Sequence, residues 1–372
     1  MNTKYIHIGK STILWEKTSF SRAFKFLKNN SLSRAELSDD NGNVKNIHYG
    51  DILIKFSECL YADEGNSIPY IINDNIAYKL LKLSPLINGD IVFADAAEDN
   101  TVGKCIEIIT HNDTDLVAGL HTIPCRPTIK FAEGYLGYYL NSSAFHNQLL
   151  QYIQGTKISS ISKKSICQTI ISYPSEIINQ QKIASYFQSL DSLIQSTSKK
   201  LVSLKQVKAA SLQSMFPQEG ETVPKVRFKG FEEEWKYEIL GKISSISIGE
   251  FVIQTKQRAN APYPVYNGGI TNTGYYDYFN QEGPKIIISA RGANAGFISK
   301  YKNRFWAGNS CYSIGINNNN WEFIYYFLQS KQDSYLKEQQ AANIPSISKK
   351  QIYTTNVLLP CYNEQIKIGL FF

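Results

Sequence analysis

The sequence predicts an α+β fold, with two similar domains of mixed strands and helices separated by a long coiled-coil spacer helix. Internal repeats define the architecture of a chain, and here the motif ISKK at 161–164 recurs at 347–350. A proline follows each copy at the same distance, at Pro174 and Pro360. Short β-type runs and helical stretches precede each motif, and an apolar stripe typical of a coiled coil follows the first.

We expect the first domain to span residues 1–172 and the second, with its connector, residues 217–358. A chain of 372 residues is too long for one ordinary core. The β-type runs lie between Gly, Asn and Asp turns, at 88–96, 104–110, 284–290 and 310–316. Helical stretches are expected before each ISKK motif, at 134–152 and 320–340. The sequence lacks the regular βαβ alternation that would indicate a parallel sheet.

The spacer helix is expected over residues 173–216. Ser175 is a candidate N-cap, Glu176 would begin the helix, and Pro217 closes it, so the helix would be about 60 Å long. Apolar residues recur in it at alternating steps of four and three, which is typical of a coiled-coil seam: Ile183, Phe187, Leu190, Ile194, Thr197, Leu201 and Leu204. We interpret this stripe as pairing with another helix; the alternative is a helix that lies on its own domain.

The end of the chain repeats the start of this helix. NQQKIASYF at 179–187 is echoed by EQIKIGLFF at 364–372, so residues 359–372 are expected to begin a second spacer helix that is cut short. A helix of about 12 residues is marginal alone. A fragment of a longer product, a helix completed by a second chain and an interrupted, impaired subunit all remain open.

Composition narrows the functional class. The chain has a net charge of +7, which permits an anionic partner. Six cysteines without a CxxC pair and five scattered histidines predict no metal site. No signal peptide or membrane-length apolar run is present, and we expect a cytoplasmic protein without membrane contact. Common catalytic motifs are missing, so no catalytic residue is predicted.

Five segments together resemble the specificity subunit of type I restriction-modification systems. They are GTKISSISKK (155–164), PSEIINQQKIASYFQSLDSLI (174–194), LQSMFPQEGETVPKVRFKGFEEEW (212–235), GDIVFADAAEDNTVGK (89–104) and VAGLHTIPCRP (117–127). The resemblance implies two target-recognition domains, each reading one half of a split DNA site, and two conserved helices packed antiparallel. It also implies a non-catalytic subunit whose partners are methylation (M) subunits and a restriction and translocation (R) subunit. Those partners would use S-adenosylmethionine, ATP and Mg, with no cofactor bound by this chain.

Within that resemblance, residues that suit DNA contact can be named. Arg suits guanine and Asn suits adenine in the major groove, so Arg291 and Asn294, on a glycine-rich turn, are candidate base readers. Glu98 and Asp99 are weaker candidates on the matching turn of the first domain. Candidates for backbone contact or, for the tyrosines, base stacking are Lys300, Lys302, Arg304, Lys104, Lys163, Lys164, Lys349, Lys350, Tyr275 and Tyr276. The alternatives are a solvated turn for Arg291, a helix approach for the paired lysines and core packing for the tyrosines.

Two other classes of function remain open. One is a coiled-coil assembly protein with RNA- or peptide-binding domains. The other is an enzyme of a type that carries no recognisable local motif.

Overall fold

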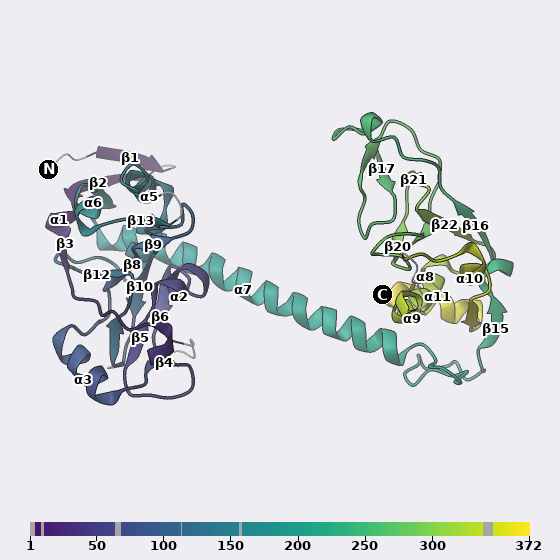
Figure 1. Ribbon diagram of the computed structural model, residues 1–372, viewed down its shortest axis with the longest axis horizontal. Coiled ribbons are helices and arrows are strands. Elements are labelled where there is room, and N and C mark those ends of the chain that lie inside the picture. The colour runs from purple at the N-terminus through teal and green to yellow at the C-terminus, as the bar shows by residue number, and fades with distance from the viewer. Residues whose placement is uncertain (1–3, 9–10, 64–67, 113, 156–157, 338–344) are drawn as a thin grey trace. The chain divides into compact units, whose positions relative to one another are not determined.

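The computed structural model describes residues 4–8, 11–63, 68–112, 114–155, 158–337 and 345–372, with the side chains of residues 4–8, 11 and 12 left aside. The chain divides into two compact units, residues 1–197 and 198–372. Each unit has its own strands, helices and core, as the sequence predicts (Figure 1).

Unit 1 is built around a five-stranded mixed sheet. Its strand order is β3 (Phe24–Phe26), β12 (Thr122–Pro127), β8 (Ile91–Ala94), β10 (Cys105–Ile109) and β6 (Cys59–Tyr61). Every residue of β8 and β10 is buried, which explains why these strands read as apolar runs. A second sheet contains β11 (Leu116–Ala118), β5 (Lys45–Ile47), β7 (Tyr70–Ile71) and β4 (Leu37–Ser38). Helices accompany these sheets at α1 (Phe20–Ala23), α2 (Tyr49–Ile54), α3 (Asp74–Leu83), α4 (Tyr135–Asn141) and α5 (Ser143–Leu150).

Unit 2 has a four-stranded antiparallel sheet of β16 (Ser244–Ile248), β22 (Cys311–Ile316), β19 (Lys285–Ser289) and β20 (Ile298–Tyr301). Its smaller sheet contains β18 (Gly274–Tyr276), β17 (Tyr263–Tyr266) and β21 (Trp306–Ala307). The expected helical stretch forms α8 (Trp321–Ser330) and α9 (Gln332–Lys337). The remainder of that stretch lies outside the described residues.

The repeated motif closes both units in the same way. Each copy forms a one-turn helix, α6 (Lys163–Cys167) or α10 (Lys349–Tyr353), capped by the serine before the two lysines. A strand follows, β14 (Ile170–Pro174) or β23 (Asn356–Leu359), and pairs antiparallel with an early strand of its own unit. The early strands are β2 (Ser11–Ser19) and β15 (Lys236–Ile239), and β1 (Lys4–Ile8) pairs with β2. The internal repeat is therefore confirmed as a repeat of structure.

A single long helix, α7 (Ile177–Ser214), follows β14. It begins at Ile177 and not at Glu176, and Ser175 does not cap it. The Ser175 hydroxyl instead donates to the Leu14 carbonyl at 3.3 Å, because the strand pairing of β14 with β2 continues through this residue. The second helix, α11 (Tyr362–Phe371), begins as expected after Pro360.

Each of these helices is tied to its unit by one buried glutamine. The Gln180 amide donates to the Pro174 carbonyl at 2.8 Å, and its Oε1 accepts from Ala132 N at 2.9 Å. Gln365 makes the same two contacts, with Pro360 O at 3.0 Å and Asn320 N at 3.0 Å. Both glutamines are almost fully buried. The glutamine that the NQQKI and EQIKI segments share therefore anchors the start of each helix to its own unit.

Candidate functional site

The glycine-rich turn of unit 2 has a structural counterpart in unit 1. In unit 2 the turn joins β19 to β20, and Gly296 N donates to Ser289 O at 2.7 Å. In unit 1 it joins β8 to β10, and Gly103 N donates to Ala94 O at 2.9 Å. Both glycines have φ of +86°, a conformation that other residues avoid. The turn of unit 1 that carries Glu98 and Asp99 therefore corresponds to the turn of unit 2 that carries Arg291.

Strand register shows which residues correspond on these turns. Ser160 lies opposite Ala96 in the ladder between β13 (Ser159–Ser160) and β9 (Ala96–Ala97). Ser346, the repeat of Ser160, lies opposite Arg291. Ala96 and Arg291 thus occupy one position of the shared framework. The framework is the same in both units, while the side chain it presents is small and apolar in one and a cation in the other.

Two further loops of unit 2 meet the Arg291 turn. Ala290 N donates to Ser310 O at 2.7 Å, and Ser289 Oγ donates to Gly269 O at 3.1 Å. Asn267 Oδ1 accepts from Ser310 N at 3.0 Å. The loops after β17, β19 and β21 therefore form one polar corner, with the Arg291 side chain exposed beside it. Asn294, the other candidate base reader, lies half-buried on the same turn.

The matching corner of unit 1 contains two histidines that the sequence reasoning missed. Asp95 N donates to His121 O at 3.0 Å, and the His121 ring nitrogen Nδ1 lies 3.1 Å from Asp95 Oδ1. The Tyr49 ring packs edge-on against His121, with ring centres 5.2 Å apart, and the centre of the His48 ring lies 4.7 Å from that of Tyr49. Burial lowers the pKa of His48. No local motif marks this group, because its members come from three loops far apart in sequence.

The predicted cations near the Arg291 turn are already engaged with protein groups. The Lys300 ammonium lies 4.4 Å from the centre of the Tyr326 ring and 4.6 Å from that of Tyr325. Lys302 pairs with Glu322 at 2.9 Å, and Arg304 pairs with Glu282 at 2.9 Å. Lys302 and Arg304 have exposed side chains and Lys300 is half-buried.

The remaining predicted contacts differ in how much surface they offer. Lys104 is half-buried, donates to the Leu53 and Phe56 carbonyls, and has its pKa lowered by burial. Tyr276 is 3% exposed and its hydroxyl is bound to the backbone of Ile253, so it serves the core, whereas Tyr275 is 38% exposed. The four lysines of the two ISKK motifs, Lys163, Lys164, Lys349 and Lys350, are exposed.

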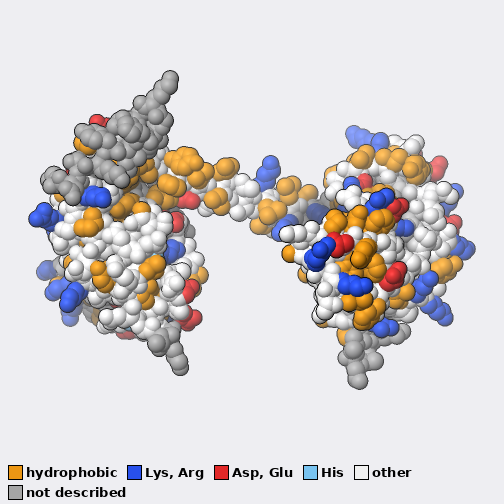
Figure 2. Space-filling model, turned by 90° about the horizontal axis from the view of Figure 1, so that it is seen from above, with side chains coloured by type: hydrophobic (Ala, Val, Ile, Leu, Met, Phe, Trp, Pro, Cys, Tyr) orange, Lys and Arg blue, Asp and Glu red, His pale blue; other side chains and the backbone are white. Residues whose placement is uncertain are grey.

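The predicted seam of α7 begins against unit 1 and continues at the surface. Ile183 packs partly against the core of unit 1, and Phe187 stacks on Tyr138 with ring centres 5.2 Å apart. The rest of the seam is exposed, from 37% to 64%, at Leu190, Ile194, Leu201 and Leu204. Figure 2 shows hydrophobic side chains gathered along this helix. Such a stripe of large apolar side chains is typical of an interaction surface.

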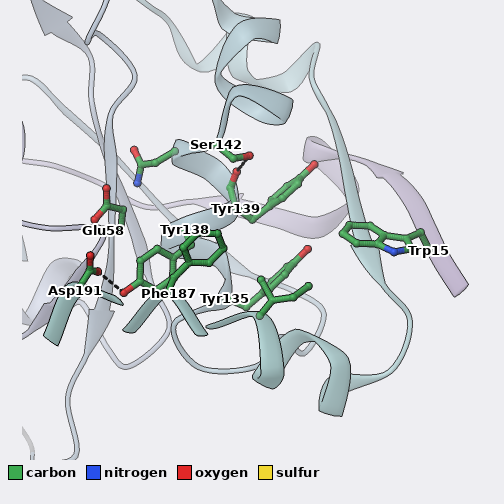
Figure 3. Close-up of a pocket in the computed structure, with 10 residues that line it drawn as sticks. Trp15, Glu58, Tyr135, Tyr138, Tyr139, Ser142, Phe187 and Asp191 are labelled. Carbon is green, nitrogen blue, oxygen red and sulfur yellow. Dashed lines mark hydrogen bonds between the residues drawn. The ribbon is translucent and has the colours of Figure 1, made fainter. Parts of the chain in front are cut away.

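An aromatic pocket lies in unit 1 where α7 meets α4. It has a volume of about 320 Å³ and is lined mainly by rings, with the carboxylates of Glu58 and Asp191 among the lining groups. Figure 3 shows the Tyr138 hydroxyl pointing to Asp191, to which it donates at 2.6 Å. The ring-bearing residues are Trp15, Tyr135, Tyr138, Tyr139 and Phe187.

Two classes of site are not found among the residues that the structure describes. In the part of the chain that the structure describes, no group of three or more His, Cys, Asp or Glu side chains is arranged to hold a metal ion. None of the helices in these residues has the length and apolar character needed to cross a membrane.

Comparison with known proteins identifies the family. The family model for the type I restriction modification DNA specificity domain matches residues 41–206 and 232–372. The chain belongs to this family. Specificity subunits are the non-catalytic DNA-recognition subunits of type I restriction-modification systems. The two matched segments correspond to two target-recognition domains separated by the long helix α7. No curated protein matches the chain in sequence.

Two solved structures from type I restriction-modification systems have the same fold as this chain. The S subunit of the type I system from M. genitalium is 17% identical with a TM-score of 0.62, over 98% of this chain and 90% of that one. A chain from a study of complex assembly and conformational transition of the type I system is 16% identical with a TM-score of 0.53, over 96% and 88%. The prediction of an α+β fold with a long helix between two target-recognition domains is confirmed.

Proposed function

We propose that this specificity subunit reads a DNA site in two parts, one with each unit. The observation that carries the proposal is the shared corner: Ala96 and Arg291 hold the same place in the same hydrogen-bonded framework but present different side chains. A repeated framework that carries an exposed cation at Arg291 and a buried methyl group at Ala96 suits two half-sites of unlike sequence, since base edges are read by side-chain chemistry.

We propose that Arg291 reads a base and that nearby cations hold the DNA backbone. Arg291 is exposed at the meeting point of three loops, and loops on a rigid scaffold are common sites of recognition. Lys302 and Arg304 are exposed and can exchange their carboxylate partners for phosphates. In unit 1, His121 and Tyr49 occupy the corresponding corner and become candidate contacts.

The reaction itself would belong to partner subunits. Methylation subunits would use S-adenosylmethionine, and the restriction subunit would use ATP and Mg, in a complex that this chain directs to its site. The exposed seam of α7, from Leu190 to Leu204, is the proposed surface for helix pairing and for assembly with the methylation subunits.

Salt-dependent DNA binding tests this function. The chain with its methylation subunits should bind one duplex sequence more tightly than competitor DNA. Several phosphate contacts should reduce the affinity by about a hundredfold or more over a few-fold rise in salt. Equal affinity for all duplexes would refute sequence reading. Preferential binding of RNA or of a peptide would favour the other class, a coiled-coil assembly protein.

A further inference from the structure

The corner of unit 1 carries a histidine where the corner of unit 2 carries a serine. Asp95 N donates to His121 O at 3.0 Å, and Ala290 N donates to Ser310 O at 2.7 Å. Strand register agrees with this match, because the residue after His121 and the residue after Ser310 each pair with the last residue of the neighbouring strand, β8 or β19. The backbone is therefore shared, and unit 1 has an acid and a histidine where unit 2 has an alanine and a serine.

In unit 1 these two side chains form a pair. His121 Nδ1 lies 3.1 Å from Asp95 Oδ1. A carboxylate at neutral pH only accepts hydrogen bonds, so the hydrogen of the neutral ring lies on Nδ1 and the other ring nitrogen, Nε2, is an acceptor. The His121 side chain is 51% exposed, and within the described ranges no group hydrogen-bonds to its Nε2. The pair thus presents a hydrogen-bond acceptor at the surface of the corner.

The backbone at His121 has a conformation that few residues adopt. Its φ is +54°, and among the described residues other than glycine only Asn318 also has a positive φ. Outliers of this kind cluster at functional sites, where the surrounding structure maintains them. The segment before His121 is held at Gly119, whose carbonyl accepts from Thr122 Oγ1 at 2.6 Å and from Asn29 Nδ2 at 3.3 Å. The ring is therefore attached to a fixed backbone.

Two neighbours also fix the orientation of the His121 ring. The Asp95 carboxylate holds Nδ1, and the Tyr49 ring packs edge-on with the two ring planes at 75°. Tyr49 N donates to Leu120 O at 3.4 Å, which joins the start of α2 to the segment that carries the histidine. A side chain selects its ligand sharply only when its own neighbours hold it in place. Asp95 and Tyr49 are thus positioning residues for His121.

Hydrogen-bond polarity separates this corner from the corner of unit 2. Arg291 has only donors, which suit the acceptors that guanine presents in the major groove. An imidazole whose Nε2 accepts suits the opposite group, the exocyclic amino group that adenine or cytosine presents there. Ala96, at the position of Arg291 in unit 1, is buried and has no polar side-chain atom. The acceptor of His121 is therefore not opposed by a donor at that position.

We propose that His121, positioned by Asp95, reads the amino group of an adenine or a cytosine for unit 1. The two corners then have opposite polarity, since unit 2 donates through Arg291 and unit 1 accepts through His121. This rests on the proposed reading of DNA by both units, to which it adds the class of base that unit 1 selects and the residue that sets this choice.

Selection from a pool of random duplexes tests the proposal. The chain with its methylation subunits should enrich a sequence in two parts, and enrichment of no sequence would refute DNA reading itself. The variant is His121→Gly, because glycine adopts a φ of +54° without strain. It should lower the preference at one base pair of one half-site about tenfold, as expected for one hydrogen bond, and leave the other half-site unchanged. If parent and variant enrich the same sequence equally well, only the role of His121 is overturned.

Base analogues at the affected pair distinguish an accepting Nε2 from a donating one. Purine in place of adenine, or pyrimidinone in place of cytosine, removes the amino group. This change should weaken binding by the parent chain about tenfold more than binding by His121→Gly. A deaza analogue of the purine in the same pair removes the N7 acceptor and should affect both chains equally. If the deaza analogue separates the two chains and the loss of the amino group does not, Nε2 donates and the proposal is wrong.

Asp95→Asn tests the positioning role. Asparagine keeps the size of the side chain, but its amide can donate to Nδ1, which places the ring hydrogen on Nε2. Discrimination by the amino group should fall about tenfold, and sensitivity to the deaza analogue should appear. A purely structural role would change neither readout, and urea unfolding of each variant reports any loss of folding. Asp40→Asn removes the same charge from an exposed position of unit 1 and should leave discrimination unchanged. Equal discrimination by Asp95→Asn and the parent chain would overturn the assignment of Asp95.

Discussion

Replacing Gln180 by alanine should destabilise unit 1 far more than its position on a surface helix implies. The side chain is 1% exposed and satisfies two buried backbone groups, Ala132 N–H and Pro174 C=O. A buried polar group left without a partner costs about 1–3 kcal/mol. With both groups unsatisfied, the free energy of unfolding of unit 1 should fall by about 2–5 kcal/mol.

Urea unfolding of the full chain measures the effect, with Gln181→Ala as the matched control because that side chain is exposed on the same helix. Hydrogen exchange at the Ala132 amide adds a local readout, since this amide donates to Gln180 and should lose protection in the variant. Gln365→Ala should reproduce the loss in unit 2, where the same contacts recur. If Gln180→Ala and Gln181→Ala have equal stability, the glutamine is not an anchor.

Three further predictions concern base reading, a buried carboxylate and assembly. Arg291→Ala should remove the preference at one base pair, worth about 1–3 kcal/mol, in a competition assay with duplex variants; a loss that is uniform over all sequences, as expected for Arg304→Ala, would make Arg291 a phosphate contact. Burial raises the pKa of Glu107 from 4.5 to about 7, against the opposing effect of the Gly134 and Gly137 amides that donate to it. The protonated Glu107 carboxyl therefore stabilises unit 1 fully below pH 4.5, and this contribution of about 3 kcal/mol is lost as the pH rises through about 7. Thermal melts over this pH range measure the loss as a fall in melting temperature. Glu107→Gln should abolish that pH dependence, and a variant whose melting temperature falls with pH as in the parent chain would contradict the prediction. Ile194→Glu should leave folding intact, because the side chain is 64% exposed, and should prevent co-purification with methylation subunits; retention equal to that of Gln195→Glu would exclude this part of the seam.

Much of the framework was predictable because its signals are local in sequence. The ISKK repeat, the prolines that follow it and the glycine of each turn depend on caps, strand starts and backbone dihedrals. Gly103 shows the strength of such a constraint: besides its φ of +86°, an added Cβ would lie 2.9 Å from Leu149 Cδ1. A position that only glycine can occupy without strain can be recognised in the sequence by the glycine itself.

The candidate site was less predictable because it depends on contacts between distant segments. Lys300 looks like a free surface cation, but α8 brings Tyr325 and Tyr326 to within 5 Å of its ammonium. Tyr275 and Tyr276 alternate on one strand, and nothing in the alternation tells which of them faces the core. The prediction that Ser175 caps the long helix was wrong for a similar reason. The Ser175 hydroxyl donates to the carbonyl of Leu14, a residue near the other end of the unit 1 sequence, which strand pairing brings beside it.

The two units share the buried residues that hold the turn and the helix, and they differ in the side chain at the position of Ala96 and Arg291. Ile161 and Ile347 lie over the turn glycines, and Gln180 and Gln365 hold the helices, so these positions are constrained by packing and hydrogen bonding. At the position shared by Ala96 and Arg291 the strand pairing uses only the backbone, and the side chain is exposed at Arg291 but buried at Ala96. The two units therefore keep the same backbone framework at this corner and the same helix anchors, while the side chain at this one position differs.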